Sequence, residues 1–148
     1  MKRERGSAVV EFVVFGVVLL VPLMYLALAV SAVQRSVLGV TEAAREAGRA
    51  YATGTASTAA ARAEYAARLA LTDQDLPADG IEVRYAAADA DCATARAEPW
   101  PLRPGATFAV CVSRTVHVPG IPGVLTGSRN TVAGRYVVRA DEHRDYGR

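Results

Sequence analysis

The sequence lacks the motifs that mark the common enzyme classes. It has no glycine-rich phosphate loop, no nucleophile elbow and no His-Glu metal motif, and its carboxylates are scattered singly. Asp89, Asp91 and Glu98 come closest to a calcium cluster, but such a group is more commonly a solvated acidic loop. We therefore expect no enzymatic activity, no cofactor and no bound metal.

Cysteine and histidine are scarce, with two residues of each. Neither cysteine has a second ligand at short spacing, and His117 and His143 form no cluster, which argues against zinc. A catalytic Cys111 with His117 would lie along one strand without a third orienting group. In an exported domain, the even pair Cys92 and Cys111 instead predicts a disulfide. Closing a loop of about 20 residues would contribute on the order of 3 kcal/mol to stability.

Charge is almost missing from one stretch of the chain. Within residues 7–34 the only charged side chain is Glu11, and the 22 residues from Phe12 to Val33 carry none. As a helix these residues would cover about 33 Å, against a hydrocarbon core of about 30 Å. Pro22 removes one backbone donor, which transmembrane helices tolerate as a kink. The composition predicts a transmembrane helix.

The remainder of the chain has no dense basic face and no acidic tail. Residues 34–148 hold 14 basic and 13 acidic side chains, which argues against nucleic-acid binding. Residues 1–6 carry a net charge of +2, and only Arg35 follows the apolar run closely. The positive-inside rule then favours a single-pass protein of the cell membrane, with a cytoplasmic N-terminus and an extracytoplasmic C-terminal domain.

Glu11 is costly where it lies, because a carboxylate within a membrane helix costs about 2.5 to 3.5 kcal/mol and calls for a partner. Gly6 lies five positions before it. The segment Gly-Ser-Ala-Val-Val-Glu-Phe at residues 6–12 resembles the class III signal of type IV pilin-like proteins. In that signal a prepilin peptidase cuts after the glycine and leaves glutamate at the fifth mature position.

The N-terminal region is open to two alternatives. Val30-Ser31-Ala32 has the small-residue spacing of a signal-peptidase site, although the apolar run exceeds the usual length of about 7 to 15 residues. Alternatively, the run is an uncut single-span anchor with an incidental Glu11. In that case the chain would carry an exported binding or regulatory domain.

Helical periodicity continues beyond the apolar run. An apolar stripe with steps of three and four predicts one helix from about Ser7 to Ala52; its members are Val33, Val37, Val40, Ala44, Ala47 and Tyr51. Glu42 with Arg45 and Glu46 with Arg49 are i,i+3 pairs that assist this helix. A ladder of small side chains permits close helix approach, and we expect it to pack against the protein's own domain rather than another subunit; it comprises Ala44, Gly48 and Ala52.

A second helix and three strands follow. The turn-forming residues 53–57 break the first helix, and Ser57 or Thr58 can cap the second, which we expect over 59–71. Its Glu64 and Arg68 have favourable i,i+4 spacing, and one of its faces carries Ala61, Tyr65 and Leu69. Alternation and β-branched content predict strands at Ile81–Tyr85, Thr107–Val118 and Thr131–Arg139.

The predicted fold class is α+β: a long N-terminal helix, a second short helix and a small antiparallel sheet of about three strands, similar to a miniature pilin fold. Proline and glycine mark two long connections, at 99–105 and 119–123. Trp100 in the first is expected to anchor its loop, with an exposed adhesive role as the alternative. We expect five parts: a basic leader (1–6), a transmembrane helix (7–33), an extracytoplasmic helical segment (34–71), a small β domain (72–140) and a flexible tail (141–148).

Residues 6–12, the apolar run with Pro22 and the segment Ala-Ala-Arg-Glu-Ala-Gly-Arg-Ala at 43–50 together resemble the TadE-like proteins of tight-adherence (Tad/Flp) pilus systems. The short forms of high-GC Gram-positive bacteria are the most similar. The resemblance implies a pseudopilin, a pilin-like subunit that acts in pilus assembly or export. Carried over, Gly6 is the last leader residue, Ser7 the new N-terminus and Glu11 the acidic assembly residue. The implied partners are a prepilin peptidase, pilin subunits, pilus assembly proteins of the membrane and further copies of the chain.

Physical chemistry gives each of these residues a role. Gly6 without a side chain obstructs a membrane peptidase least, and the basic stub holds the cleavage site at the cytoplasmic face. In a filament, Glu11 could pair with the Ser7 ammonium of a neighbour, which offsets two desolvation costs with one contact. Well-known pilins begin with phenylalanine rather than serine, and the major tight-adherence pilins are far shorter. A minor or priming subunit therefore fits better than the main fibre protein.

Overall fold

The computed structural model describes residues 5–116 and 130–146 of the chain, with side chains from Ala8 onward. Two α-helices, one short 3-10 helix and three strands are present in this part, in the order α1 (Arg5–Ala52), α2 (Ala59–Thr72), β1 (Glu82–Ala87), η1 (Cys92–Thr94), β2 (Thr107–Thr115) and β3 (Thr131–Arg139). This confirms the α+β class and the expected element order. The expected loop at 119–123, His117 and most of the basic stub lie outside the described residues.

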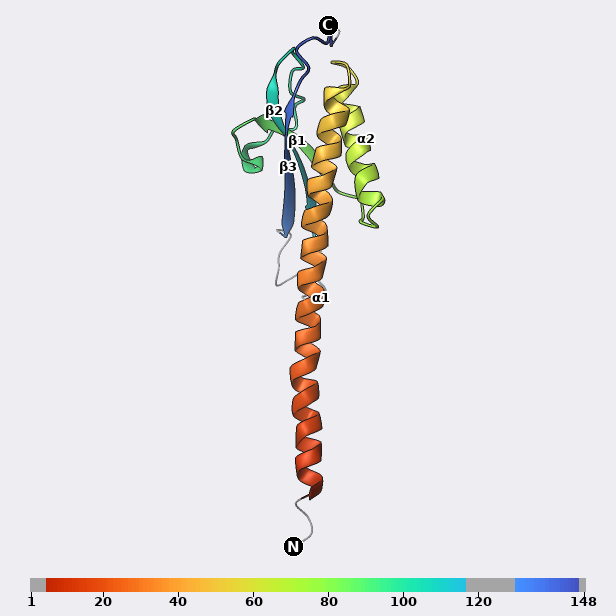
Figure 1. Cartoon of the computed structure of the whole chain (residues 1–148), viewed down its shortest axis with the longest axis vertical. Coiled ribbons are helices and arrows are strands. Elements are labelled where there is room, and N and C mark those ends of the chain that lie inside the picture. Colours follow the sequence, from red (N-terminus) through yellow and green to blue (C-terminus); the bar gives the residue numbers. More distant parts are fainter. Residues whose placement is uncertain (1–4, 117–129, 147–148) are drawn as a thin grey trace.

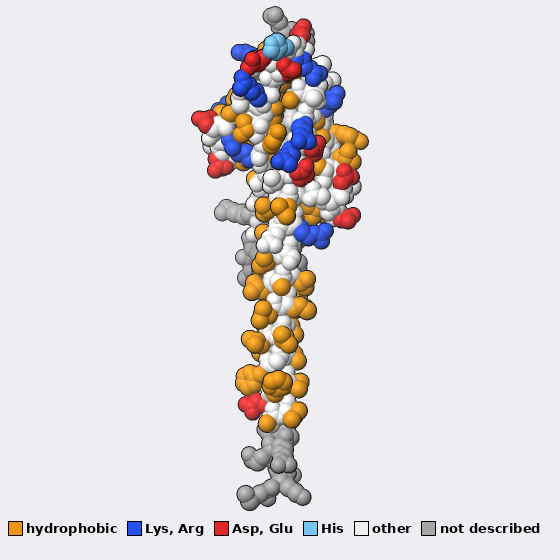
Figure 2. Space-filling model, in the orientation of Figure 1, with side chains coloured by type: hydrophobic (Ala, Val, Ile, Leu, Met, Phe, Trp, Pro, Cys, Tyr) orange, Lys and Arg blue, Asp and Glu red, His pale blue; other side chains and the backbone are white. Residues whose placement is uncertain are grey.

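Helix α1 runs unbroken for 48 residues, with Pro22 inside it. Its N-terminal half stands free of the rest of the molecule (Figure 1) and is covered with apolar side chains (Figure 2). From Ala8 to Arg35, a part that we call the stalk, no residue is buried. From Ser36 onward α1 enters the body of the protein, which we call the head. One helix therefore serves as both apolar rod and core element.

The sheet has the order β1-β2-β3, and both pairings are antiparallel. Because side chains alternate between faces, the central strand β2 contributes to two clusters. Phe108, Val110 and Val112 belong to the main core together with α1 and α2. Ala109 and Cys111 belong to a smaller cluster with Ala86 of β1 and Ala95. The sheet is thus covered by α1 on one face and by the connection after β1 on the other.

Helix α1 lies between α2 and the sheet (Figure 1), so it is the middle of the head. The α1–α2 contact is built from alanines, namely Ala43, Ala44 and Ala47 of α1 and Ala59, Ala63, Ala67 and Ala70 of α2. Methyl side chains let two helix backbones approach closely. The predicted face of Ala61, Tyr65 and Leu69 is instead exposed, with Tyr65 69% and Leu69 47% accessible. The buried face of α2 is the alanine face.

The predicted apolar stripe of α1 is buried from its third member onward. Val40, Ala44, Ala47 and Tyr51 are at most 2% exposed, whereas Val37 remains 41% exposed. Val37 lies where the stalk meets the head, so only part of its surroundings is protein. The stripe therefore marks the point along α1 at which the head begins to cover it.

Glycines make the contact between α1 and β3 possible. A Cβ on Gly134 of β3 would overlap the backbone carbonyl of Val40. A Cβ on Gly48 of α1 would lie 2.6 Å from Tyr136 Cδ1 and 2.7 Å from Val138 Cγ2, both on β3. The ladder that contains Gly48 is therefore used within the protein's own domain, as expected.

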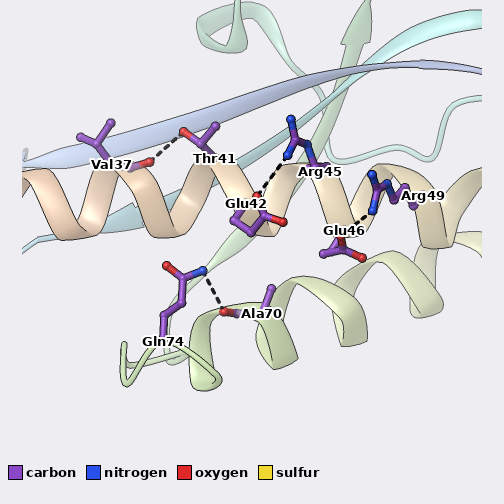
Figure 3. Close-up of polar contacts among 8 residues, drawn as sticks. All are labelled: Val37, Thr41, Glu42, Arg45, Glu46, Arg49, Ala70 and Gln74. Carbon is purple, nitrogen blue, oxygen red and sulfur yellow. Dashed lines mark hydrogen bonds and ion pairs between the residues drawn. The ribbon is translucent and has the colours of Figure 1, made fainter.

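The predicted ion pairs form, at 3.6 Å for Glu42–Arg45, 3.1 Å for Glu46–Arg49 and 2.8 Å for Glu64–Arg68. The α1 pairs lie on its surface above α2 (Figure 3). They are largely exposed, so each contributes only a few tenths of a kcal/mol. Arg68 also donates from Nη1 to the Ala78 carbonyl at 2.9 Å, which ties α2 to the segment before β1.

The turn between the helices differs in detail from the expectation. Thr58 occupies the N-cap position of α2, but neither its hydroxyl nor that of Ser57 caps the helix. The Thr58 Oγ1 accepts a hydrogen bond from the Thr55 N–H at 3.1 Å instead. The side chain thus stabilises the preceding turn, because Thr58 has helical rather than extended backbone angles.

Residues 141–146 of the expected flexible tail make contacts with the head, although 141–145 stay exposed. Tyr146 is buried, its hydroxyl accepts the Asp141 N–H at 2.8 Å, and its carbonyl accepts the Ala56 N–H at 3.2 Å. Arg144 donates from Nη2 to the Thr53 carbonyl at 2.6 Å. These contacts bring the segment back onto the turn between α1 and α2.

The α1–β3 contact gives a direct test. Gly134→Ala forces a methyl group into the Val40 backbone, which cannot move aside as a flexible side chain could. We expect a loss of about 1 to 3 kcal/mol in the free energy of unfolding, measured by chemical denaturation. Gly16→Ala on the stalk is the matched control, because a Cβ there meets nothing within 4 Å. Equal stability of the two variants would contradict the close contact.

Candidate functional site

The predicted processing residues lie in the first turn of α1. The helix begins at Arg5, so the Gly6–Ser7 peptide bond has helical backbone geometry. A protease that requires an extended segment would need to unwind the helix around this bond.

Glu11 is exposed on the stalk. Among the described side chains, from Ala8 onward, it takes part in no hydrogen bond or ion pair. Residues three or four apart on a helix lie on one face about 5 to 6 Å apart, so position 7 is within reach of Glu11 along the same helix. An amine at Ser7 would therefore lie one turn from this carboxylate, and a neighbouring copy could supply the same amine.

The stalk around Glu11 is apolar on all sides. Large side chains from Val9 to Val30 are exposed, and Phe12 reaches 79%. In the described chain, α1 is the one helix long and apolar enough to cross a membrane, and none of its most apolar stretch is buried within the protein. Such a surface needs lipid or other apolar helices around it.

The predicted disulfide between Cys92 and Cys111 is present, with a Cα–Cα distance of 5.7 Å. It ties η1 to the central strand β2 on the face opposite α1. Arg135 of β3 reinforces the same connection by donating from Nε to the Ala90 carbonyl at 3.1 Å and from Nη2 to the Ala88 carbonyl. Because Cys111 is oxidised, it is not available as a nucleophile.

The acidic residues near the disulfide, in the connection between β1 and β2, are the candidate calcium ligands of the sequence. Within residues 5–116 and 130–146 no group of three His, Cys, Asp or Glu side chains could hold a metal ion. Asp89, Asp91 and Glu98 are therefore not brought together as a cluster. Nothing in their placement supports calcium binding.

Trp100 packs as an anchor of its loop. Its ring stacks on Phe108 with the centroids 6.1 Å apart, and its carbonyl accepts a hydrogen bond of 2.5 Å from the Tyr51 hydroxyl. Tyr51 lies 4.9 Å from Tyr85 and 5.2 Å from Phe108 between ring centroids. This joins the end of α1, the sheet and the loop into one aromatic cluster.

The two tyrosines of the aromatic cluster stay neutral. Burial raises the pKa of Tyr51 above its ordinary value. Burial also raises the pKa of Tyr85, and the nearby Tyr51 and Glu64 raise it further. Both phenols are therefore neutral near neutral pH, and their packing joins the end of α1 to the sheet.

Sequence reasoning missed one arginine, Arg114 of β2. It follows Phe108, Val110 and Val112 at two-residue spacing, so its position is on the inward face of the strand, and it is only 9% exposed. A charged residue at an inward position of a predicted strand is the signal that would have found it. In the structure it lines a pocket where the stalk enters the head.

Comparison with known proteins gives no match among family models, curated proteins or solved structures. The TadE-like resemblance therefore remains a prediction carried by residues 6–52.

The disulfide gives a second test. Replacing both Cys92 and Cys111 with serine should lower the free energy of unfolding of the head by about 3 kcal/mol, because the unfolded chain regains the freedom of the closed loop. Denaturant titration of the oxidised protein and of the variant measures the difference. Reduction of the wild-type protein should give the same loss, and an unchanged midpoint after reduction would contradict a stabilising role.

Proposed function

We propose that this protein is a pseudopilin, a minor pilin-like structural subunit that acts in the assembly or export of a tight-adherence type IV-like pilus. A prepilin peptidase would process it after Gly6. The observation that carries the proposal is Glu11, an exposed carboxylate with no partner among the described side chains, set in a free apolar stalk that continues without a break into the core of the head.

The continuous helix supports a role in assembly. The stalk makes no contact that buries it within its own chain, so the same apolar surface suits lipid before assembly and the stalks of neighbouring subunits afterwards. The core contacts of α1 begin at Ser36, so the head stays intact when the stalk changes its surroundings. A subunit could thus leave the bilayer without refolding.

Glu11 suits the contact between subunits. In an apolar surrounding its carboxylate is costly alone, and a Ser7 ammonium of a neighbour would neutralise it with a short-range pair. The stalk has only this one carboxylate. The ion pair therefore forms at one axial position of the neighbouring subunit and is lost when that subunit is shifted along the axis. The pair would therefore set the axial register between subunits as well as the affinity.

The disulfide supports an extracytoplasmic head, since disulfides persist in oxidising compartments. Together with the basic stub, this supports a single-pass protein with a cytoplasmic N-terminus. The Gly6–Ser7 bond would then lie at the cytoplasmic face, where a membrane peptidase could reach it.

A second candidate function is an exported binding or regulatory domain held by an uncut anchor. The self-contained packing of the head from Ser36 onward favours it, because a head that folds on its own core needs no other subunit. In this case Glu11 would have no assembly role, and residues 1–6 would be retained.

Processing distinguishes the candidates. The intact mass of the protein isolated from membranes should show loss of residues 1–6, and Gly6→Leu should abolish that loss because a side chain obstructs the scissile bond. Gly16→Leu, a glycine change in open space on the same helix, should be processed normally. Retention of residues 1–6 in the wild-type protein would refute processing, and a mature chain that starts at Val33 would indicate secretion and exclude both candidates.

The role of Glu11 is tested separately. Glu11→Gln keeps the size of the side chain and removes its charge, so processing should continue while the assembled fraction falls about tenfold or more, because a buried ion pair loses one partner. Sedimentation of sheared filaments with quantitative detection of the subunit measures this fraction. Glu42→Gln, an acidic position in the head part of the same helix, serves as the control. Normal assembly of the Glu11→Gln protein would refute the pairing role.

A further inference from the structure

A pocket of about 560 Å³ lies where the stalk enters the head. Three parts of the fold form it: α1, the segment between α2 and β1, and the end of β2. Its lining includes four charged side chains, Arg35, Asp75, Asp79 and Arg114, together with Ala32 and Ser36 of α1. The pocket is distinct from the Gly6–Glu11 region, which lies at the other end of the stalk.

Arg114 is the unusual member of this lining. It is 9% exposed, and its Nε and Nη1 atoms are buried without a hydrogen-bond partner in the part of the chain that the structure describes. A guanidinium is always charged, so two unsatisfied buried donors cost free energy that the fold does not recover by itself. Arg114 also lines the pocket, and a guanidinium is the group with which proteins bind phosphate and carboxylate groups in a fixed fork geometry.

The two aspartates do not satisfy this arginine. Asp75 and Asp79 are exposed, and neither forms an ion pair with Arg35 or Arg114 in the described structure. Their charges nevertheless cancel those of the two arginines. The pocket therefore suits a group that carries a negative and a positive charge side by side better than a free dianion.

The pocket also lies at a particular depth. Ala32 belongs to the apolar run that ends at Val33. A helix rises about 1.5 Å per residue, so Ser36 lies about 4.5 Å beyond Val33 along the helix axis. The headgroup layer occupies about 5 to 7 Å on each side of the hydrocarbon core. If the stalk spans the membrane, as the proposed function requires, the pocket opens into this layer.

We infer that the pocket binds the headgroup of a phospholipid, with the phosphate against Arg114 and Arg35. A primary ammonium next to that phosphate finds acceptors in Asp75 and Asp79, so an ethanolamine phospholipid is the matching ligand. The inference rests on the membrane anchoring of the proposed function and adds a lipid partner for the head. Binding would hold the head against the extracytoplasmic surface of the cell membrane.

The test uses the full-length protein in phosphate-free maltoside micelles, with thermal unfolding followed by the fluorescence of Trp100, the only tryptophan. Added phosphatidylethanolamine should raise the unfolding midpoint by about 4 °C or more. Monogalactosyldiacylglycerol, which has acyl chains and no phosphate, should leave it unchanged. Millimolar inorganic phosphate should also leave it unchanged, and an equal rise with phosphate alone would assign the pocket to a free anion and overturn the lipid assignment.

Arg114→Gln should abolish the shift caused by phosphatidylethanolamine, while Arg103→Gln, an exposed arginine of the loop before β2, should retain it. If Arg114→Gln does not fold, Arg35→Gln provides the second variant and should reduce the shift at least by half. An equal shift in the wild-type protein and the variant, an equal effect of the galactolipid, or no shift at all would overturn the inference. None of these measurements depends on processing or filament assembly, so failure here is distinguishable from failure of the proposed function.

Discussion

The structure depends on the close packing of α1 against its two neighbours. Alanines at the α2 contact and glycines at the β3 contact, Gly48 and Gly134, bring backbones together. Small side chains bury little apolar area each, but they let the backbones of α1, α2 and β3 approach closely in the core. This packing makes the C-terminal part of α1, from Ser36 onward, the central element of the head, and the sheet and α2 are arranged around it.

A head of this size needs support beyond its core, and the chain provides it at two places. The disulfide and Arg135 hold the connection after β1 on the outer face of the sheet. The cluster around Tyr51 and Phe108 closes the end of α1 on the inner face. The disulfide and the aromatic cluster lie on opposite faces of β2, so the central strand is held in place from both sides.

Local sequence patterns predicted most of this fold, because helix and strand periodicity depend only on residues close together in the chain. The step of three and four residues along α1, the switch to alternation after Gly80 and the even cysteine pair each follow from chain geometry, and each matches the structure. Three features did not follow. The buried face of α2 is made of alanine, which a search for large apolar residues such as Tyr65 and Leu69 overlooks. Tyr146 owes its position to contacts with a distant segment, which no local pattern contains. Arg114 stands at an inward strand position that the alternation does show, but a charged residue there is an exception to the pattern.

The unbroken passage of α1 from stalk to head has a mechanical consequence. Because the helix is continuous, the direction in which the head faces follows the orientation of the stalk about its own axis. Each residue of a helix turns it by about 100° and advances it by about 1.5 Å. The length of the segment between Glu11 and Ser36 therefore sets the angle between the Glu11 carboxylate and the head, and a single inserted or deleted residue would change that angle by about 100° while leaving both ends chemically intact.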